Sequence, residues 1–204
     1  MLTKNWMKSL GICLTDKNVL FLGSADSPLV AWLEQQGESV LTTCEILDKK
    51  FVIESNISFI ISYGYRHIIK SDILSLFPRQ AINLHISYLP WNKGADPNFW
   101  SFVQDTPKGV TIHYLDPGLD TGDIIVQKEI TFNEKVETLA SSYKKLHDEI
   151  QHLFKVNWHF IKNKSCLSFK QPVGGSFHRL KDKEPLQYLL KNGWDTPVSL
   201  LKNK

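Results

Sequence analysis

The first 85 residues alternate short apolar runs with segments whose apolar residues recur at helical spacing. The apolar runs cover residues 18–23, 39–44, 57–64 and 81–85, and the helical patterns cover residues 27–37 and 71–77. Pro28 and Gly37 suit the start and the end of the earlier helix. Strands that alternate with helices indicate a parallel sheet with helical crossovers. The sequence therefore predicts an α/β fold of Rossmann-like rhythm, with a mostly parallel sheet flanked by helices.

The turn after the first apolar run lacks the glycine pattern of a dinucleotide site. It reads Gly23-Ser24-Ala25-Asp26, and no GxGxxG or Walker sequence occurs. Those patterns bring backbone N–H groups against phosphates. We therefore expect no dinucleotide cofactor.

Two polar side chains interrupt the apolar run at residues 81–85. Side chains of a strand alternate between its faces, so Asn83 and His85 share one face. Pro90 and Gly94 follow, so the strand ends near His85, where open α/β sheets place ligands. An amide can hold an oxyanion and an imidazole can move a proton near neutral pH. The alternative is a polar strand end with a satisfied histidine.

A carboxylate that could complete this pair is Asp120, in a Gly-rich loop further along. A carboxylate fixes the tautomer of an imidazole and favours its charged form. Asp-x-Gly is also common in plain turns, so Asp120 alone is compatible with a turn aspartate.

Two longer motifs surround these residues. The first runs over residues 83–90 and continues with Gly94-Ala95; the second covers residues 109–114 and 119–125. Together they resemble the active-site strand and loop of the formyltetrahydrofolate-dependent formyltransferases. The resemblance implies that Asn83, His85 and Asp120 are catalytic, that N10-formyltetrahydrofolate is the formyl donor, and that no metal takes part. His113, within the second motif, either supports these residues or is simply buried.

The resemblance also implies two binding loops. The pterin loop would contain Tyr65, Arg66, His67 and Ile68, with Asp116 and Gly118 as further cofactor contacts; the alternative is a plain loop. The substrate loop would contain Trp91, Lys93, Gly94, Asp96 and Asn98. It also reads as a helix entry, with Asp96 as the cap, Pro97 in the first turn and Trp100 in the core.

Within the family, the chain is most similar to bacterial sugar N-formyltransferases acting on dTDP-linked 4-amino-4,6-dideoxy sugars. This implies an enzyme that makes an N-formylated nucleotide sugar for surface polysaccharide (lipopolysaccharide or O-antigen) synthesis. The alternatives are a glycinamide ribonucleotide formyltransferase and a non-catalytic folate or nucleotide-sugar binding protein. We expect no RNA-binding domain of the methionyl-tRNA formyltransferase kind.

Composition limits the partners. The chain has 204 residues, 42% of them hydrophobic, and a formal net charge of +3. Basic residues do not cluster densely, so we expect no nucleic-acid partner. Apolar runs are too short for a membrane span, and the start lacks a signal-peptide pattern. The three cysteines are scattered. The expected location is the cytoplasm.

The last third of the chain changes character. Residues 136–160 read as a long helix, and we expect its His147, His152 and His159 to be solvated or capping rather than metal ligands. Residues 1–164 would form the catalytic domain. In residues 165–204, two strand-like segments, 166–170 and 176–180, flank a Pro/Gly turn and predict a β-hairpin, followed by a helix at 184–190.

An isolated hairpin is marginally stable. Pairing with the same element of a second subunit would bury Leu167, Phe169 and Phe177 about a two-fold axis, so we expect a homodimer. The alternative is a hairpin folded back on its own domain.

Overall fold

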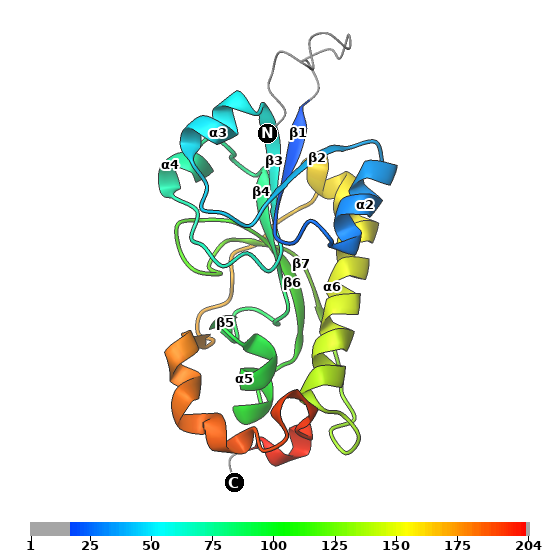
Figure 1. The fold of residues 1–204 in the computed structure, drawn as a ribbon, viewed down its shortest axis with the longest axis vertical. Coiled ribbons are helices and arrows are strands. Elements are labelled where there is room, and N and C mark those ends of the chain that lie inside the picture. The colour runs from blue at the N-terminus through cyan, green and yellow to red at the C-terminus, as the bar shows by residue number, and fades with distance from the viewer. Residues whose placement is uncertain (1–16, 203–204) are drawn as a thin grey trace.

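The computed structural model describes residues 17–202, in which a six-stranded sheet forms the centre of the molecule (Figure 1). The strand order is β2-β1-β3-β4-β6-β7. The strands are β1 (Asn18–Leu22), β2 (Ser39–Thr43), β3 (Ile57–Ser62), β4 (Ala81–His85), β6 (Gly109–Tyr114) and β7 (Ile124–Glu129). The pairs among β2, β1, β3 and β4 are parallel, whereas β6 is antiparallel to both β4 and β7. The predicted α/β fold with a mainly parallel sheet is confirmed.

Helices connect the parallel strands, and two of the three begin at a residue whose side chain caps them. The connecting helices are α2 (Pro28–Gln35), α3 (Lys49–Glu54) and α4 (Ser71–Leu74). The hydroxyl of Ser27 accepts the backbone N–H of Leu29, and a carboxylate oxygen of Asp48 accepts the N–H of Phe51. These bonds satisfy N–H groups that have no partner within a helix. The helix α3 was not anticipated, and α4 is shorter than the predicted 71–77.

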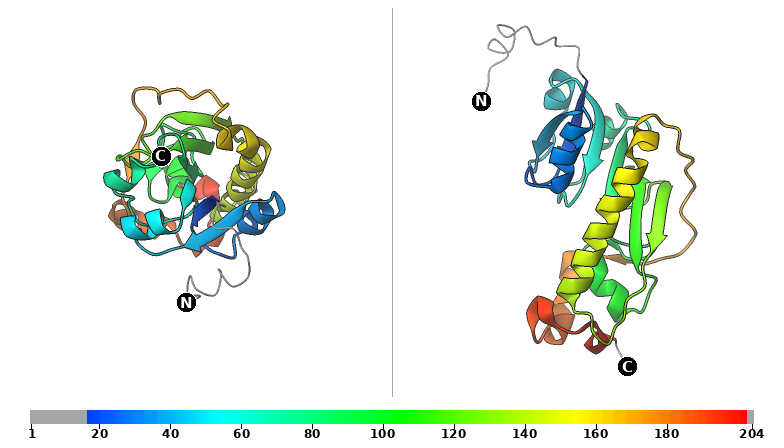
Figure 2. Two further views of the ribbon diagram at one scale, coloured as in Figure 1. Left: turned by 90° about the horizontal axis from the view of Figure 1, so that it is seen from above. Right: turned by 90° about the vertical axis from the view of Figure 1, so that its right-hand side faces the viewer.

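Alternate strand residues point into two different cores. On one face, α2 and α6 (Leu139–Lys162) cover the sheet; on the other, α3 and α4 do. Ile82 and Leu84 lie in the first core, so Asn83 and His85 point to the face opposite α6. Figure 2 shows α6 running along the sheet and on to the C-terminal segments. The predicted helix at 136–160 is therefore confirmed, with its start moved to Leu139, where Thr138 and Ser141 form a capping box.

The C-terminal segment departs from the predicted hairpin, because its two arms do not pair with each other in the described residues. Phe169 forms an antiparallel bridge to Ile124 on β7. The second arm is β8 (Phe177–His178), which pairs in parallel with β5 (Lys93–Gly94). An isolated hairpin of such short strands would be only marginally stable in water. Each arm instead forms backbone hydrogen bonds with the rest of the molecule. The segment runs along the edge of the sheet formed by β7 (Figure 2).

Short 3₁₀ helices end the described chain. They are η1 (Leu180–Leu189), η2 (Gly193–Asp195) and η3 (Val198–Leu200). The predicted helix at 184–190 therefore begins earlier and is of the 3₁₀ type, with Pro185 inside it. These segments pack with α5 (Pro97–Val103) and the start of α6 around Phe99, Phe102 and Val198. No helix within residues 17–202 is long and apolar enough to cross a membrane.

Candidate active site

Asn83 and His85 lie at the carboxyl end of β4, opposite residues of the antiparallel strand β6. Asn83 faces His113 and His85 faces Thr111 in the register. The side chains of Asn83 and His113 meet: the Asn83 Nδ2 is 3.3 Å from the His113 Nε2. The His113 Nδ1 lies 2.9 Å from the carbonyl oxygen of Tyr114, so Nδ1 donates and Nε2 accepts. His113 is thus a buried partner of Asn83, which supports the first of its two interpretations.

Asp120 reaches the same place from the loop between β6 and β7. Its Oδ1 accepts a hydrogen bond of 3.1 Å from the Asn83 Nδ2, and its Oδ2 lies 3.7 Å from the His85 Nε2. Asp120 has a left-handed backbone (φ 53°), which aspartate tolerates better than most residues. At Gly122, a Cβ would lie 1.8 Å from the carbonyl oxygen of Tyr114. Only glycine allows this loop to pack so closely against β6.

The backbone of the following loop completes the surroundings of His85. The His85 Nε2 is 3.3 Å from the carbonyl oxygen of Asn92, and the N–H of Gly94 donates to the Asp120 Oδ2 at 2.8 Å. A carbonyl oxygen only accepts, so Nε2 carries a hydrogen and the neutral ring has its lone pair on Nδ1. The basic nitrogen of His85 is therefore Nδ1.

Burial and charge set the protonation of the pair. Burial lowers the pKa of His85 below its ordinary value of 6.5, and the charge of Asp120 opposes part of this shift. Burial alone would raise the pKa of Asp120, but the charge interaction with His85 and the hydrogen bond from the Gly94 N–H hold it well below its usual range. At neutral pH, a neutral imidazole therefore lies beside an ionised carboxylate. This combination can accept a proton and then stabilise the resulting imidazolium.

Comparison with known sequences agrees with this geometry. Residues 40–156, more than half of the chain, match the family described as formyl transferase. The chain belongs to this formyltransferase family. Over 110 residues it is 32% identical to a methionyl-tRNA formyltransferase of Clostridioides difficile, which covers 53% of this chain and 33% of that protein. The chain therefore spans about a third of the length of that curated relative.

Solved structures of formyltransferases resemble the whole fold. The formyltransferase PseJ of Anoxybacillus kamchatkensis, crystallised with UDP-4,6-dideoxy-4-formamido-L-AltNAc and tetrahydrofolate, is 54% identical and covers 90% of this chain and 97% of its own, with a TM-score of 0.87. A 4-N formyltransferase of Francisella tularensis is 21% identical and covers 83% of this chain and 79% of its own, with a TM-score of 0.71. At 21% identity, the similarity to the Francisella tularensis enzyme shows a shared fold alone.

The predicted cofactor residues lie in two loops at the carboxyl ends of β3 and β6. Arg66, His67 and Ile68 are exposed, whereas the Tyr65 hydroxyl donates to the carbonyl oxygen of Glu45 at 2.7 Å. The second loop is closed by Asp116, whose Oδ1 accepts the Gly118 N–H at 3.1 Å and the Thr121 hydroxyl at 2.7 Å. A Cβ at Gly118 would lie 1.9 Å from the Thr121 Oγ1. Glycine therefore allows the tight turn that precedes Asp120.

The predicted substrate residues have different environments. Trp91 is half-buried, Lys93 and Gly94 form β5, and Asp96 makes an ion pair of 2.7 Å with Lys183. Asn98 is only 2% exposed, and its Nδ2 donates to the Leu139 carbonyl and the Ser142 hydroxyl of α6, each at 3.1 Å. Asn98 thus joins α5 to α6. The helix does begin at Pro97, and Trp100 is buried, as the helix-entry interpretation predicts. Asp96 takes the cap position, but its carboxylate makes no capping hydrogen bond and pairs with Lys183 instead, so that part of the prediction was wrong.

Two features of the site were not anticipated. Gln171 donates through Nε2 to the carbonyl oxygens of Asp120 and Gly122, at 2.8 and 2.9 Å. No sequence pattern marks a contact across some fifty residues. His147, expected to be solvated or capping, is instead partly buried and hydrogen-bonded through Nδ1 to the Tyr63 hydroxyl. That expectation was wrong because His147 lies on the side of α6 that faces the end of β3.

No group of three His, Cys, Asp or Glu side chains in residues 17–202 is placed to hold a metal ion.

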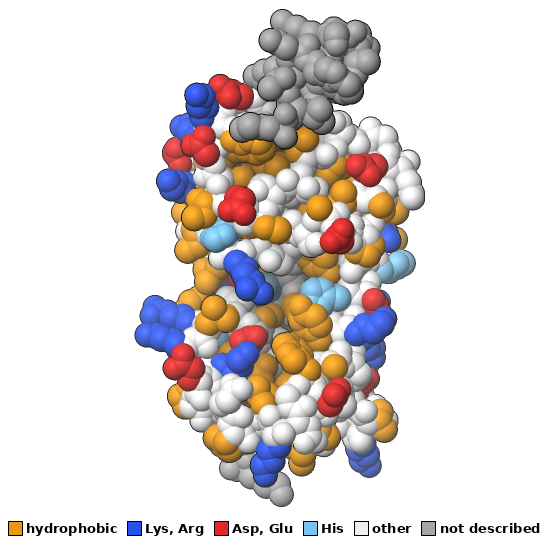
Figure 3. Space-filling view, viewed as in Figure 1, with side chains coloured by type: hydrophobic (Ala, Val, Ile, Leu, Met, Phe, Trp, Pro, Cys, Tyr) orange, Lys and Arg blue, Asp and Glu red, His pale blue; other side chains and the backbone are white. Residues whose placement is uncertain are grey.

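The face in Figure 3 is hollowed near mid-height, and basic, histidine and apolar side chains border the hollow.

Proposed function

We propose that this chain transfers a formyl group from N10-formyltetrahydrofolate to the 4-amine of a UDP-linked 4-amino-4,6-dideoxy sugar. The observation that carries the proposal is the 54% identity, over nearly the whole of both chains, to a formyltransferase crystallised with such a formamido sugar and tetrahydrofolate. The sequence motifs alone favoured a dTDP-linked sugar. Because of this similarity, we propose a UDP-linked sugar in place of the dTDP-linked sugar.

The arrangement of the three side chains supports a direct transfer. The sugar amine attacks the formyl carbon, and its proton passes to the Nδ1 of His85. One hydrogen of the Asn83 Nδ2 bonds Asp120, and the other bonds His113 over the longer distance of 3.3 Å. The formyl oxygen would take over this second hydrogen as it becomes an oxyanion. The bond from carbon to N10 then breaks, and the proton on His85 moves to N10. Asp120 stabilises His85 while it is charged.

The flanking loops would bind the two substrates. Tyr65, Arg66, His67 and Ile68 form the proposed pterin loop with Asp116 and Gly118, as the family resemblance implies. Trp91, Lys93, Gly94 and Asp96 form the proposed acceptor loop next to His85, with Asn98 fixing the helix behind it. The bond from the Gly94 N–H to Asp120 supports this placement, because it connects the acceptor loop directly to the carboxylate.

A substrate panel tests the proposal. The chain is incubated with N10-formyltetrahydrofolate and, separately, UDP- and dTDP-linked 4-amino sugars and glycinamide ribonucleotide, and mass spectrometry detects the added formyl group. We expect the fastest turnover with a UDP-linked sugar. Turnover of glycinamide ribonucleotide without turnover of any amino sugar would contradict the proposal and favour the purine-precursor enzyme. Binding without turnover of any compound would favour a non-catalytic protein.

We also propose that the protein is a homodimer assembled through the segment of residues 166–177. Leu167 is 90% exposed, and Phe169, Val173 and Phe177 on the same segment are exposed as well. Apolar side chains gathered on one segment favour contact with another chain. Light scattering should report a dimer for the intact chain and a monomer for Leu167→Asp with Val173→Asp. The control is Ile53→Asp, which adds the same charge at an exposed apolar position on α3, outside this segment. A monomeric intact chain would contradict the proposal.

On the family resemblance, we place the reaction in the cytoplasm and its product among the precursors of surface polysaccharide, such as lipopolysaccharide O-antigen. A deletion strain that retains the formylated sugar in its polysaccharide would contradict this placement.

A further inference from the structure

Asn92 lies in the loop after β4 and is 0% exposed, although asparagine is usually found at the surface. Its backbone is left-handed (φ 54°), a conformation that asparagine tolerates better than most residues. Buried polar groups are kept in the interior of a protein by hydrogen bonds. The partners of Asn92 therefore show what this residue holds in place.

Both ends of the Asn92 side chain are hydrogen-bonded. The Nδ2 donates at 2.7 Å to the hydroxyl oxygen of Thr106, in the segment that follows α5. The Ser176 hydroxyl accepts the Asn92 backbone N–H at 2.9 Å and donates to the Asn92 Oδ1 at 3.1 Å. Asn92 is thus held from two sides, by the end of α5 and by the C-terminal segment.

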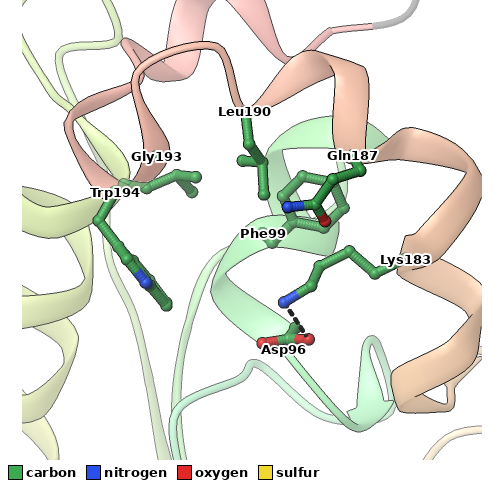
Figure 4. Close-up of a pocket in the computed structure, with 8 residues that line it drawn as sticks. Asp96, Phe99, Lys183, Gln187, Leu190, Gly193 and Trp194 are labelled. Carbon is green, nitrogen blue, oxygen red and sulfur yellow. Dashed lines mark ion pairs between the residues drawn. The ribbon is translucent and has the colours of Figure 1, made fainter.

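The loop that carries Asn92 is also fixed before and after this residue. Before it, the Ser87 hydroxyl donates to the carbonyl oxygen of Trp91 at 2.6 Å. After it, Asp96 forms an ion pair of 2.7 Å with Lys183 of η1, as Figure 4 shows. These contacts leave the carbonyl oxygen of Asn92 little freedom to move relative to β4.

Two oxygens lie near the Nε2 of His85, and only one of them is within hydrogen-bond distance. The carbonyl oxygen of Asn92 is 3.3 Å away, whereas the Oδ2 of Asp120 is 3.7 Å away. Both Asp120 oxygens already accept other donors, Oδ1 from the Asn83 amide and Oδ2 from the Gly94 N–H. Asp120 therefore acts on the imidazole by its charge, while the hydrogen bond of the ring goes to Asn92.

We propose that Asn92 is a positioning residue of the transferase, whose carbonyl oxygen holds the Nε2–H of His85 and so directs the ring Nδ1 toward the acceptor amine. Thr106 and Ser176 keep this carbonyl oxygen in place. The proposal rests on the proposed function for the role of Nδ1. It assigns different tasks to the two neighbours of His85: Asn92 orients the ring, and Asp120 stabilises its charge.

NMR spectra of the full chain with isotope-labelled histidine test which oxygen holds the ring. A buried, hydrogen-bonded imidazole N–H exchanges slowly with water and gives its own resonance, which His85→Asn identifies by its loss. The resonance should remain in Asp120→Asn, because the carbonyl acceptor is still present. It should be lost in Thr106→Val, which keeps the shape of threonine but has no hydroxyl oxygen for the Asn92 Nδ2.

Three further variants separate this role from general loss of stability. Thr106→Ser keeps the hydroxyl and should retain the resonance. Asn92→Gly removes both side-chain anchors while permitting the left-handed backbone, and should lose it. The matched control is Thr196→Val: Thr196 is 1% exposed, and its hydroxyl donates at 2.7 Å to the carbonyl oxygen of Gly193 on η2 instead of contacting the loop after β4. This control should keep the resonance.

Steady-state kinetics, with rates expressed per folded chain, supply a second readout. In Thr106→Val and Asn92→Gly, kcat should fall by roughly tenfold, because a base that is turned away from the amine is poorly placed for proton transfer. The KM for each substrate should change little. Thr106→Ser and Thr196→Val should keep their kcat.

A resonance that is lost in Asp120→Asn but retained in Thr106→Val and Asn92→Gly would assign the Nε2–H to the carboxylate and overturn the proposal. An unmodified chain without this resonance would also overturn it, as would an unchanged kcat in both loop variants. The spectra require no substrate. A chain that shows the expected resonances but formylates no sugar would therefore support Asn92 as the partner of His85 and contradict the proposed function alone.

Discussion

His85 is neutral and Asp120 is ionised at neutral pH, and the His85 Nε2 and the Asp120 Oδ2 are 3.7 Å apart. The charge interaction with His85 and nearby hydrogen-bond donors favour the Asp120 anion, whereas burial dominates at His85. Asp120 accepts hydrogen bonds from the Asn83 amide and the Gly94 N–H, which favour its anion. His85 is enclosed, which favours its neutral form. At the residue scale, the site is thus ready to take up a proton before any substrate binds.

Loss of any one of the three side chains should remove much of the turnover. We expect Asn83→Ala, His85→Asn and Asp120→Asn each to lower kcat by about a hundredfold to a thousandfold. A positioned proton-transfer group or an oxyanion donor typically accelerates a reaction by about this factor. Single-turnover formylation with saturating substrates is the measurement, with circular dichroism to verify folding. Near-normal kcat in all three variants would mean that the chemistry occurs elsewhere.

The pH profile should carry the signature of the buried imidazole. The base is active when neutral, so kcat/KM should fall as pH falls through the pKa of His85, which burial places below 6.5. Asp120 opposes this shift, so Asp120→Asn should move the acid limb to still lower pH. Asp72→Asn, at an exposed ion pair of α4, should leave the limb in place. An acid limb that moves upward in Asp120→Asn would contradict this assignment.

At the scale of the elements, the sheet and the long helix are joined by a polar contact as well as by the core. The Tyr63 hydroxyl, at the end of β3, bonds His147 and accepts from the Gln151 Nε2 at 3.2 Å, both on α6. Burial raises the pKa of Tyr63 to about 12, so the hydroxyl keeps its proton. The contact fixes the end of β3, from which the proposed pterin loop begins.

Removal of this hydroxyl should destabilise the fold. Tyr63→Phe leaves the partly buried His147 Nδ1 without its partner, which typically costs about 1–3 kcal/mol in the free energy of unfolding. Urea denaturation followed by circular dichroism measures the change. Tyr188→Phe, at a 64% exposed position, should stay within about 0.5 kcal/mol. Equal stability of the two variants would show that water replaces the Tyr63 hydroxyl at no cost.

Elements with a clear period could be predicted, and pairings over long distances could not. Alternation placed Asn83 and His85 on one strand face, and their proximity to Asp120 is confirmed, while their catalytic roles stay predictions. The hairpin was wrong because a strand pattern states that a segment pairs, but not with which edge. The partner of β8 is the two-residue β5, too short to produce any alternation. Gln171 was missed for the same reason.

At the scale of the whole molecule, the C-terminal segment closes around the site from outside the sheet. Gln171 holds the backbone of the Asp120 loop, and Ser176 accepts the Asn92 N–H at 2.9 Å. A Cβ at Gly175 would lie 2.0 Å from the carbonyl oxygen of Pro90. Both loops that surround His85 are therefore held by residues 171–178.

Gln171 should thus matter for turnover more than for stability. We expect Gln171→Leu to lower kcat by roughly tenfold, because displacement of the Asp120 loop misaligns the carboxylate. The urea midpoint should change little, because Gln171 lies outside the core. Lys170→Leu, an exposed neighbour, is the control for the added apolar surface. Unchanged kcat in Gln171→Leu would show that the loop holds its own conformation.

Residues 171–178 lie outside the central sheet and follow all of its strands and α6 in the sequence. A ribosome releases the chain from its N-terminus, so every strand of the sheet and all of α6 emerge before Gln171 and Ser176 do. A nascent chain can then form its hydrophobic core while the loops around His85 still lack their outer supports. The capacity for chemistry would arise only after the fold that carries it.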